Sequence, residues 1–353
     1  METPRAHRVV KKSAPFIIMT LVMALSSCSS APKKNITRSD VENGNSQAVG
    51  TKSSPSTTPE VLGPPDPVGP MPVGAQPAGP SYGPDPIEIR PIVLVLGPGL
   101  ARGFAYAGIL RALHDEKIPV GAIVGTEMGA LIGSLYGVST TINEFEWSLV
   151  KFKEDLFTKD AGLFSSLLSA GGDTGKLDDV IQHEFAAKDL KESKVRLQII
   201  LRNEKGNSSF LVDHGSVNSA VRGALGLTGF ISSTDWNGQK VTSAGSIRPF
   251  GVSEARLLGI GPVVVVDVLH SPVGSRTKTV KSKSVLDYLQ LAKNSGLDEL
   301  KAADFVLTPD FNGIDFLDYE KKNDIVFRGQ NAVLRKRGEL RHLVGLPQED
   351  AQP

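Results

Sequence analysis

The sequence predicts an α/β protein with a mostly parallel central sheet flanked by helices, built as a single domain at about residues 89–345. Three observations lead to this expectation. Short β-branched runs alternate with helix-length segments throughout this region, as they do where helices connect parallel strands. A Pro-rich segment without aliphatic periodicity comes before it, and a short basic and apolar segment opens the chain. Residues 346–353 have no such pattern and are expected to form a disordered tail.

Four runs have the composition of strands that are buried on both faces. Each is continuous, apolar and rich in β-branched residues, which is typical of the middle of a parallel sheet. These runs are 91–96, 119–124, 197–201 and 263–269. Amphipathic stretches predict helices at 105–116, 176–185 and 252–258.

The N-terminus has the pattern of a secretory signal peptide. Basic residues from Arg5 to Lys12 precede an apolar run at 16–25. A helix of that length measures about 15 Å, roughly half the hydrocarbon thickness of a bilayer, and so cannot span it. The sequence Leu-Ser-Ser-Cys at its end resembles the lipobox of bacterial lipoproteins, which implies a signal peptide at 1–27 and acyl chains, palmitate among them, on Cys28. An ordinary secretory signal is the alternative.

Cys28 is the only cysteine in the chain, so it has no partner for an intramolecular disulfide. Several acyl chains on one residue would anchor the protein firmly, because two already suffice. In similar lipoproteins of diderm bacteria an Asp after the cysteine tends to retain the protein at the inner membrane. Ser29 therefore implies an outer-membrane lipoprotein of the cell envelope that faces the periplasm.

Residues 28–88 are expected to form a lipidated, disordered Pro/Ser/Gly-rich linker. Ten prolines fall between Pro59 and Pro86, and aliphatic residues are sparse, so this segment cannot pack a core. A partly extended tether fits this composition, and a ligand for an aromatic groove is the alternative. Nucleic acid is not an expected partner, because the net charge is +1 with basic and acidic residues interleaved.

Two strand-to-helix turns carry the candidate chemistry, since ligands of α/β sheets bind beyond the carboxyl ends of the strands. The first is a Gly-rich loop that opens a helix, and its free N–H groups can hold an anion, although many such turns need glycine only for backbone shape. The second has glycines two residues on either side of a central residue, which is the spacing of a nucleophile elbow. The loop positions are Pro98, Gly99, Leu100, Ala101, Arg102 and Gly103, and the elbow positions are Gly125, Thr126, Glu127, Met128 and Gly129.

The chain around these turns resembles the patatin-like phospholipases, the PNPLA family. The opening of that family is similar to LVLGPGLARGFAYAGILRALHDEKIPVGAIVGTEMGALIGSLYG. Its second half resembles GSVNSAVRGALGLTGFISSTDWNGQKVTSAGSIRPFGVSEARLLG, and its closing segment resembles AADFVLTPDFNGIDFLDY. The resemblance covers about residues 90–335 and implies a single patatin-like domain. It also implies kinship with enzymes of lipid metabolism that hydrolyse acyl esters with a Ser–Asp dyad.

Three parts of that machinery differ here. Glu127 stands where the family has its serine, and Ser243 stands where it has its aspartate. A carboxylate attacking an ester would give an unstable anhydride, and a serine hydroxyl is no base at neutral pH. Pro98 has no N–H, and the loss of one oxyanion donor can lower the rate by about 10² to 10³.

The leading hypothesis is therefore a catalytically inactive pseudo-phospholipase, a pseudoenzyme that binds lipid, an acyl ligand or an envelope protein. One alternative is a lipid acyl hydrolase with rearranged residues, for which Thr126, Ser134 and Ser243 are the nearby hydroxyls. Another is a structural interaction module on a stalk. No cofactor and no metal site are expected, because the histidines lack the spacing of metal ligands.

Minor candidates lie outside the two turns. The segment 171–177 superficially resembles a phosphate loop, but no Ser or Thr follows Lys176, so a flexible loop is expected there. A catalytic role of Asp213 and His214 is a further alternative.

The carboxyl group of Glu127 is expected to occupy the vacated site as an internal anion. At an elbow it stands over the N-terminus of the following helix, where unpaired N–H groups favour negative charge. The expected donors are the backbone amides of residues 99–103, Arg102, Arg248, or several of these. Without such partners, burial would raise its pKa.

Overall fold

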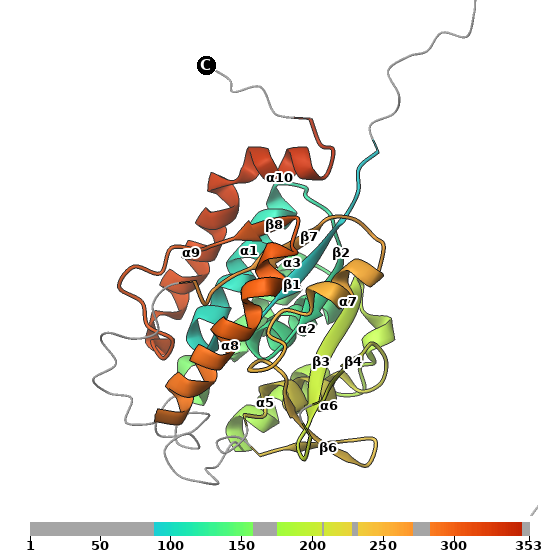
Figure 1. Ribbon diagram of the computed structural model, residues 1–353, viewed down its shortest axis with the longest axis vertical. Coiled ribbons are helices and arrows are strands. Elements are labelled where there is room, and N and C mark those ends of the chain that lie inside the picture. Colours follow the sequence, from blue (N-terminus) through green and yellow to red (C-terminus); the bar gives the residue numbers. More distant parts are fainter. Residues whose placement is uncertain (1–87, 158–174, 207, 228–231, 271–282, 348–353) are drawn as a thin grey trace, which may run out of the picture. The chain divides into compact units, whose positions relative to one another are not determined.

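The computed structural model describes residues 88–157, 175–206, 208–227, 232–270 and 283–347, all of which belong to one unit, Ala78–Pro353 (Figure 1). The signal peptide, Cys28 and nearly all of the linker lie outside the described residues, as do residues 348–353 and the segment 171–174. Within the described ranges, no helix combines the length and the hydropathy that a membrane span requires.

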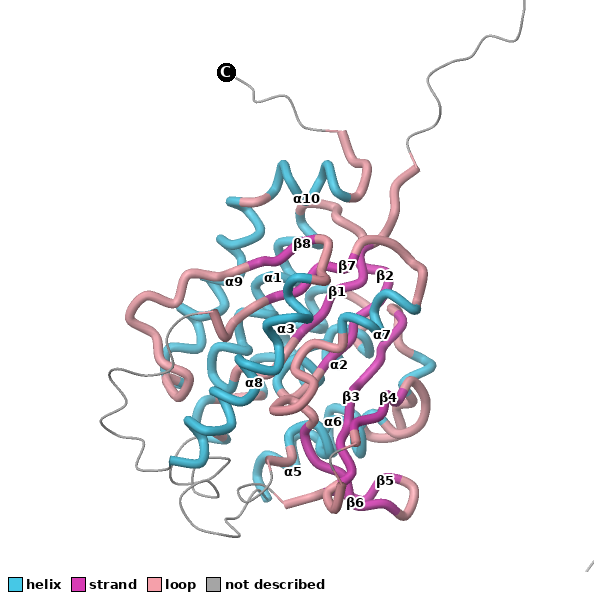
Figure 2. The backbone as a smooth tube through the Cα atoms, in the orientation of Figure 1, coloured by secondary structure: helices cyan, strands magenta, loops and turns pink. Residues whose placement is uncertain are grey.

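A mixed sheet forms the centre of the described fold (Figure 2). Its strands are β1 (Ile92–Leu96), β2 (Val120–Gly125), β3 (Arg196–Asn203), β4 (Ser209–Val212), β5 (Thr234–Trp236), β6 (Gln239–Ser243), β7 (Val263–Val266) and β8 (Phe305–Leu307). They follow the order β5-β6-β3-β2-β1-β7-β8, and β4 pairs with β3. The pairs from β3 through β2, β1 and β7 to β8 are parallel, whereas β4 and β6 run antiparallel to β3, and β5 runs antiparallel to β6.

The register of the central strands brings their carboxyl ends to one level. Leu96, the last residue of β1, pairs with Gly125 of β2 on one side and with Val266 of β7 on the other. All residues of β1 are fully buried, which explains its continuous β-branched composition. The turns that follow β1, β2 and β7 therefore meet at the same edge of the sheet.

Helices cover both faces of the sheet. They are α1 (Ala105–Asp115), α2 (Met128–Val138), α3 (Ile142–Lys151), α5 (Gly175–Phe185), α6 (Val217–Leu225), α7 (Val252–Leu257), α8 (Lys283–Lys301), α9 (Lys322–Arg335) and α10 (Arg337–Leu343), with 3₁₀ turns η1 (Leu100–Phe104), η2 (Glu154–Leu156), η3 (Leu190–Glu192) and η4 (Tyr319–Lys321). The helices α1 and α2 pack against each other on one face of the sheet, and α7 and α8 pack against each other on the other face (Figure 1).

Glycines let α1 and α9 approach each other closely. A Cβ on Gly108 of α1 would collide with the carbonyl oxygen of Val326, and one on Gly329 of α9 would collide with that of Ala105. Any larger residue at either position would push the two helices apart. This contact fixes α9 over the helix that follows the Gly-rich loop.

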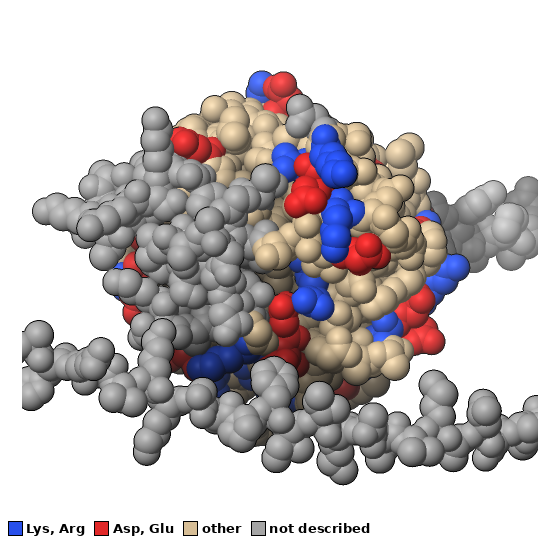
Figure 3. Space-filling view, turned by 90° about the horizontal axis from the view of Figure 1, so that it is seen from below, with Lys and Arg blue, Asp and Glu red and all other residues tan. Residues whose placement is uncertain are grey.

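The predicted α/β class with a mostly parallel, helix-flanked sheet is confirmed. The strand expected at 263–269 ends earlier, at Val266, because the carboxyl group of Asp267 accepts a hydrogen bond from the N–H of Leu269 (2.8 Å) and turns the chain. The expected helix at 176–185 corresponds to α5, so Lys176 lies in a helix. On the face of the molecule drawn in Figure 3, basic and acidic side chains are interspersed.

Candidate active site

Glu127 lies at a sharp turn between β2 and α2. Its backbone has φ 47° and ψ −120°, a conformation that costs a non-glycine residue about 1–3 kcal/mol. Both flanking glycines are sterically required: a Cβ on Gly125 would lie 2.8 Å from the backbone of Ala130, and one on Gly129 would collide with the carbonyl group of Leu96. The structure thus places Glu127 at the elbow that the glycine spacing predicts.

The carboxyl group of Glu127 is held by the backbone of the Gly-rich loop. Gly99 N–H donates to Oε2 at 2.8 Å, and Leu100 N–H donates to Oε1 at 3.2 Å. The side chain is only 1% exposed. These two hydrogen bonds join the turn after β2 to the turn after β1, which the sheet register brings together.

Burial raises the pKa of Glu127 to about 7, although the hydrogen bonds from Gly99 and Leu100 act in the opposite direction. Removal of a carboxylate from water costs more than two neutral donors return. At neutral pH the group is therefore near the midpoint between its ionised and protonated forms. Burial, and then the charge of Glu127, raise the pKa values of Tyr106, Tyr288 and Tyr319 well above their ordinary range.

The two arginines expected as further partners of Glu127 bind other groups. Nε and Nη2 of Arg102 donate to the carbonyl oxygen of Ile314 at 3.2 and 2.7 Å, and the guanidinium lies 3.8 Å from the ring centroid of Phe316. Burial lowers the pKa of Arg102 to about 10. Arg102 therefore attaches the Gly-rich loop to the segment before η4, and Ala101 N–H adds a bond to the carbonyl of Phe316 (2.9 Å).

Arg248 lies in the turn after β6, and its side chain binds residues of α7. Nη2 donates to Ser253 Oγ at 2.6 Å and pairs with Glu254 at 2.6 Å. Among the described residues, neither arginine pairs with Glu127. The absence of a paired cation agrees with the upward direction of the Glu127 pKa.

Ser243 ends β6, where the family pattern would place an aspartate. Its Oγ accepts a hydrogen bond from Gly245 N–H at 3.1 Å and lies 3.4 Å from the hydroxyl of Tyr288. A Cβ on Gly245 would collide with that hydroxyl and would lie 3.0 Å from Cβ of Pro98. Tyr288 comes from α8, and sequence reasoning missed it because no local pattern indicates a contact between residues 45 positions apart.

Other candidate residues have structural or surface positions. Thr126 Oγ1 donates to the carbonyl oxygen of Pro249 at 2.6 Å, and Ser134 is buried within α2 without a hydrogen-bond partner in the structure. Asp213 and His214 form an exposed pair (2.8 Å). They follow Val212 of β4, which pairs with Ile199 of β3, and Ile199 pairs on its other side with Gly125 of β2; β3 therefore lies between this pair and the elbow. The remaining loop and elbow positions, Gly103 and Met128, are buried.

Among the described residues, the two turns hold an internal carboxyl group where a patatin-like site would bind an oxyanion. The two amides that could stabilise a developing oxyanion already hold a carboxyl group. The position opposite the elbow carries a hydroxyl in place of a carboxylate. Acyl transfer needs a nucleophile, a base and free oxyanion donors in one place.

Comparison with known proteins relates this chain to the patatin-like phospholipases. The family model for patatin-like phospholipases matches residues 94–255, from β1 to α7. Patatin-like phospholipase domain-containing protein 7 of Rattus norvegicus is 26% identical over 53% of this chain and 14% of its own length. The lysophospholipase NTE1 of Phaeosphaeria nodorum is 26% identical over 51% of this chain and 12% of its own. The chain thus spans about one seventh or less of these relatives.

Among solved structures, VipD from Legionella pneumophila aligns with 72% of this chain and with 67% of its own chain. The TM-score is 0.41 and the sequence identity is 11%.

Proposed function

Because the chain belongs to the patatin-like phospholipase family, we propose that it is a member without hydrolytic activity that acts by binding a lipid, an acyl ligand or an envelope protein. The observation that carries this proposal is the carboxyl group of Glu127 on the amides of Gly99 and Leu100. The elbow turn is retained, but the amides that would bind an oxyanion are occupied by the carboxyl group of Glu127.

Occupation of the amides opposes the transition state of ester hydrolysis. A tetrahedral intermediate needs donors about 3 Å from its oxyanion. In this protein Gly99 and Leu100 already donate to Glu127, and Pro98 has no N–H to offer. When Glu127 is ionised, its charge also repels any oxyanion that forms nearby.

The second half of the dyad is missing as well. Ser243 bonds to Gly245 and faces Tyr288. The pKa of the Tyr288 phenol lies well above its ordinary value, because of burial and then the charge of Glu127, so this phenol stays neutral near pH 7. Neither group can remove a proton from a nucleophile at that pH.

The names of the relatives support a lipid as the bound partner. The fungal relative is named a lysophospholipase, and the rat relative contains a patatin-like phospholipase domain. A cleft that once accepted acyl chains can keep affinity for them after hydrolysis is lost, since binding and catalysis rest on different interactions.

The proposal includes attachment to the cell envelope, most specifically to the outer membrane, through acyl chains on Cys28. This residue lies outside the described residues, and the support is the lipobox-like sequence. The Cys28→Ala variant should move from the membrane fraction to the soluble fraction, whereas Ser29→Ala should stay. Retention of Cys28→Ala as firm as that of the wild type would show that another feature anchors the protein.

Hydrolysis itself is tested with short acyl esters and phospholipids as substrates. The wild-type protein should show no turnover above that of Glu127→Gln, a near-isosteric control. Robust wild-type turnover that Glu127→Gln or Thr126→Val abolishes would overturn the proposal.

Restoration of the dyad gives a sharper comparison. Glu127→Ser/Ser243→Asp rebuilds both catalytic positions, frees the amides of Gly99 and Leu100, and should exceed the wild type in ester turnover. Because Pro98 still lacks an N–H, we expect the gain to be small. If the folded double variant is no more active than the wild type, other residues of the Gly-rich loop, Pro98 among them, also prevent hydrolysis.

A further inference from the structure

A separate cavity of about 230 Å³ lies beside the end of β7. Its apolar walls are Phe250, Leu269, Leu297 and Leu300. Phe250 and Leu269 are each only 1% exposed, whereas Leu297 on α8 is 50% exposed and so lies at the mouth. An apolar cavity of about 150 Å³ accepts benzene, so this one has room for a benzene-sized ring and a short substituent.

One buried carboxyl group belongs to this cavity. Asp267 is 5% exposed, and its Oδ1 accepts a hydrogen bond from Leu269 N–H at 2.8 Å. Among the described residues no cation pairs with it. Burial raises its pKa, while the hydrogen bond from Leu269 N–H and then the charges of His270 and Lys293 act in the other direction. A buried acceptor of this kind gains from a donor that a ligand brings.

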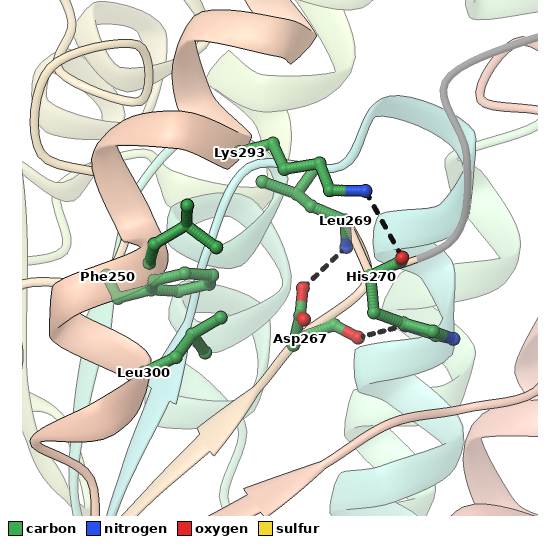
Figure 4. Close-up of a pocket in the computed structure, with 7 residues that line it drawn as sticks. Phe250, Asp267, Leu269, His270, Lys293 and Leu300 are labelled. Atoms are coloured by element: carbon green, nitrogen blue, oxygen red, sulfur yellow. Dashed lines mark hydrogen bonds between the residues drawn. The ribbon is translucent and has the colours of Figure 1, made fainter.

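Two basic side chains of the lining donate to backbone oxygens rather than to the carboxyl group of Asp267. Lys293 Nζ donates to the carbonyl oxygen of His270 at 3.3 Å, and His270 Nδ1 donates to the backbone oxygen of Asp267 at 2.8 Å. Figure 4 shows the ammonium group of Lys293 turned towards His270 and away from Phe250. Its aliphatic stem therefore contributes apolar surface.

The cavity is distinct from the Glu127 site. The ring of Phe250 separates it from the Gly-rich loop, since a Cβ on Gly97 would lie 2.6 Å from that ring. None of the lining residues binds Glu127. Binding in this cavity is therefore independent of the proposed loss of hydrolysis.

We propose that this cavity binds a small neutral molecule with an apolar body and a hydroxyl group that donates to Asp267. The apolar walls favour the apolar part of the ligand. The carboxyl group of Asp267 attracts a hydroxyl donor and repels an anion. A cationic ligand would meet the ammonium group of Lys293 in the same lining.

The experiment compares three probes that share one skeleton: 2-phenylethanol, phenylacetate and 2-phenylethylamine. Binding to the purified protein is measured by chemical-shift perturbation or calorimetry at neutral pH. The alcohol should bind at least about tenfold more tightly than the acid, because Asp267 accepts a hydrogen bond from the hydroxyl but repels the carboxylate of the acid. A tenfold ratio corresponds to a difference of about 1.4 kcal/mol in binding free energy. Equal or tighter binding of phenylacetate, or tighter binding of the amine, would overturn the assignment.

Variants locate the binding. Leu297→Trp fills the mouth and should abolish binding of the alcohol, whereas Leu291→Trp, at an exposed position on the same helix outside the cavity, should leave it unchanged. Asp267→Asn retains an acceptor for Leu269 N–H, so the turn persists, and the preference for alcohol over acid should fall towards one. Undiminished binding in Leu297→Trp, or an undiminished preference in Asp267→Asn, would contradict the proposal.

Discussion

Glu127 and Asp267 are buried carboxyl groups at the same edge of one sheet, and burial raises the pKa of both. Glu127 receives its hydrogen bonds from Gly99 and Leu100, which precede it by 28 and 27 residues. Asp267 receives its bond from Leu269, two residues further on. Burial sets the direction of both pKa shifts, whereas the position of the donors decides what each group stabilises: Glu127 joins two parts of the fold, and Asp267 closes a turn.

The comparison predicts that loss of the Glu127 carboxyl group has the larger effect on stability. Glu127→Ala leaves two buried N–H groups without an acceptor and creates a cavity. We expect a loss of about 3–4 kcal/mol in the free energy of unfolding at pH 5, where the carboxyl group of the folded protein is protonated. Urea denaturation at pH 5 measures this loss.

Glu127→Gly is the matched control for backbone strain. Glycine tolerates the positive φ of this position, so Glu127→Gly should be less destabilised than Glu127→Ala by about 1 kcal/mol. A loss below about 1 kcal/mol in Glu127→Ala would show that the two hydrogen bonds contribute little.

The second prediction concerns pH. The folded-state pKa of Glu127, about 7, lies above its ordinary value of 4.5, so the folded protein binds the proton more tightly than the unfolded chain. The stabilisation from this proton is fully present below pH 4.5 and is lost as pH rises through 7, by on the order of 3 kcal/mol. The free energy of unfolding of wild type minus that of Glu127→Gln should therefore fall between pH 5 and pH 8. A difference that stays constant or rises would contradict the shift.

The smallest effect is expected for Asp267→Asn. The asparagine oxygen can still accept the hydrogen bond of Leu269 N–H, so the turn after β7 persists and the loss should be below about 1 kcal/mol. Thermal or urea unfolding checks this value, with Asp267→Ala as the variant that removes the acceptor. A larger loss for Asp267→Asn than for Glu127→Ala at pH 5 would reverse the comparison.

Local steric rules made part of the site predictable from sequence. The elbow could be predicted because Gly125 and Gly129 are required by contacts with their own turn and with the end of β1. The same holds for the buried strands, whose continuous apolar composition reflects burial on both faces. In contrast, nothing local in the apolar run of β3 indicates that its second half pairs with antiparallel strands.

The directions of long polar side chains were not predictable in this way. Arg102 turns to Ile314 and Phe316, which follow it by more than 200 residues, and Arg248 turns to Glu254 in the first turn of α7. Tyr288 reaches Ser243 from α8. Such partners depend on tertiary packing rather than on spacing, so the sequence predicted the amide donors of Glu127 but also suggested two arginines that bind elsewhere.

Titration of the Glu127 side-chain carboxyl carbon by NMR tests the central claim most directly, because it reports both the burial of the group and its contact with the loop. We predict a midpoint near pH 7, with the amide resonances of Gly99 and Leu100 shifting at the same midpoint. A midpoint near the ordinary value of 4.5, with the two amide resonances unmoved, would show that the carboxyl group is solvated and that the oxyanion loop is free.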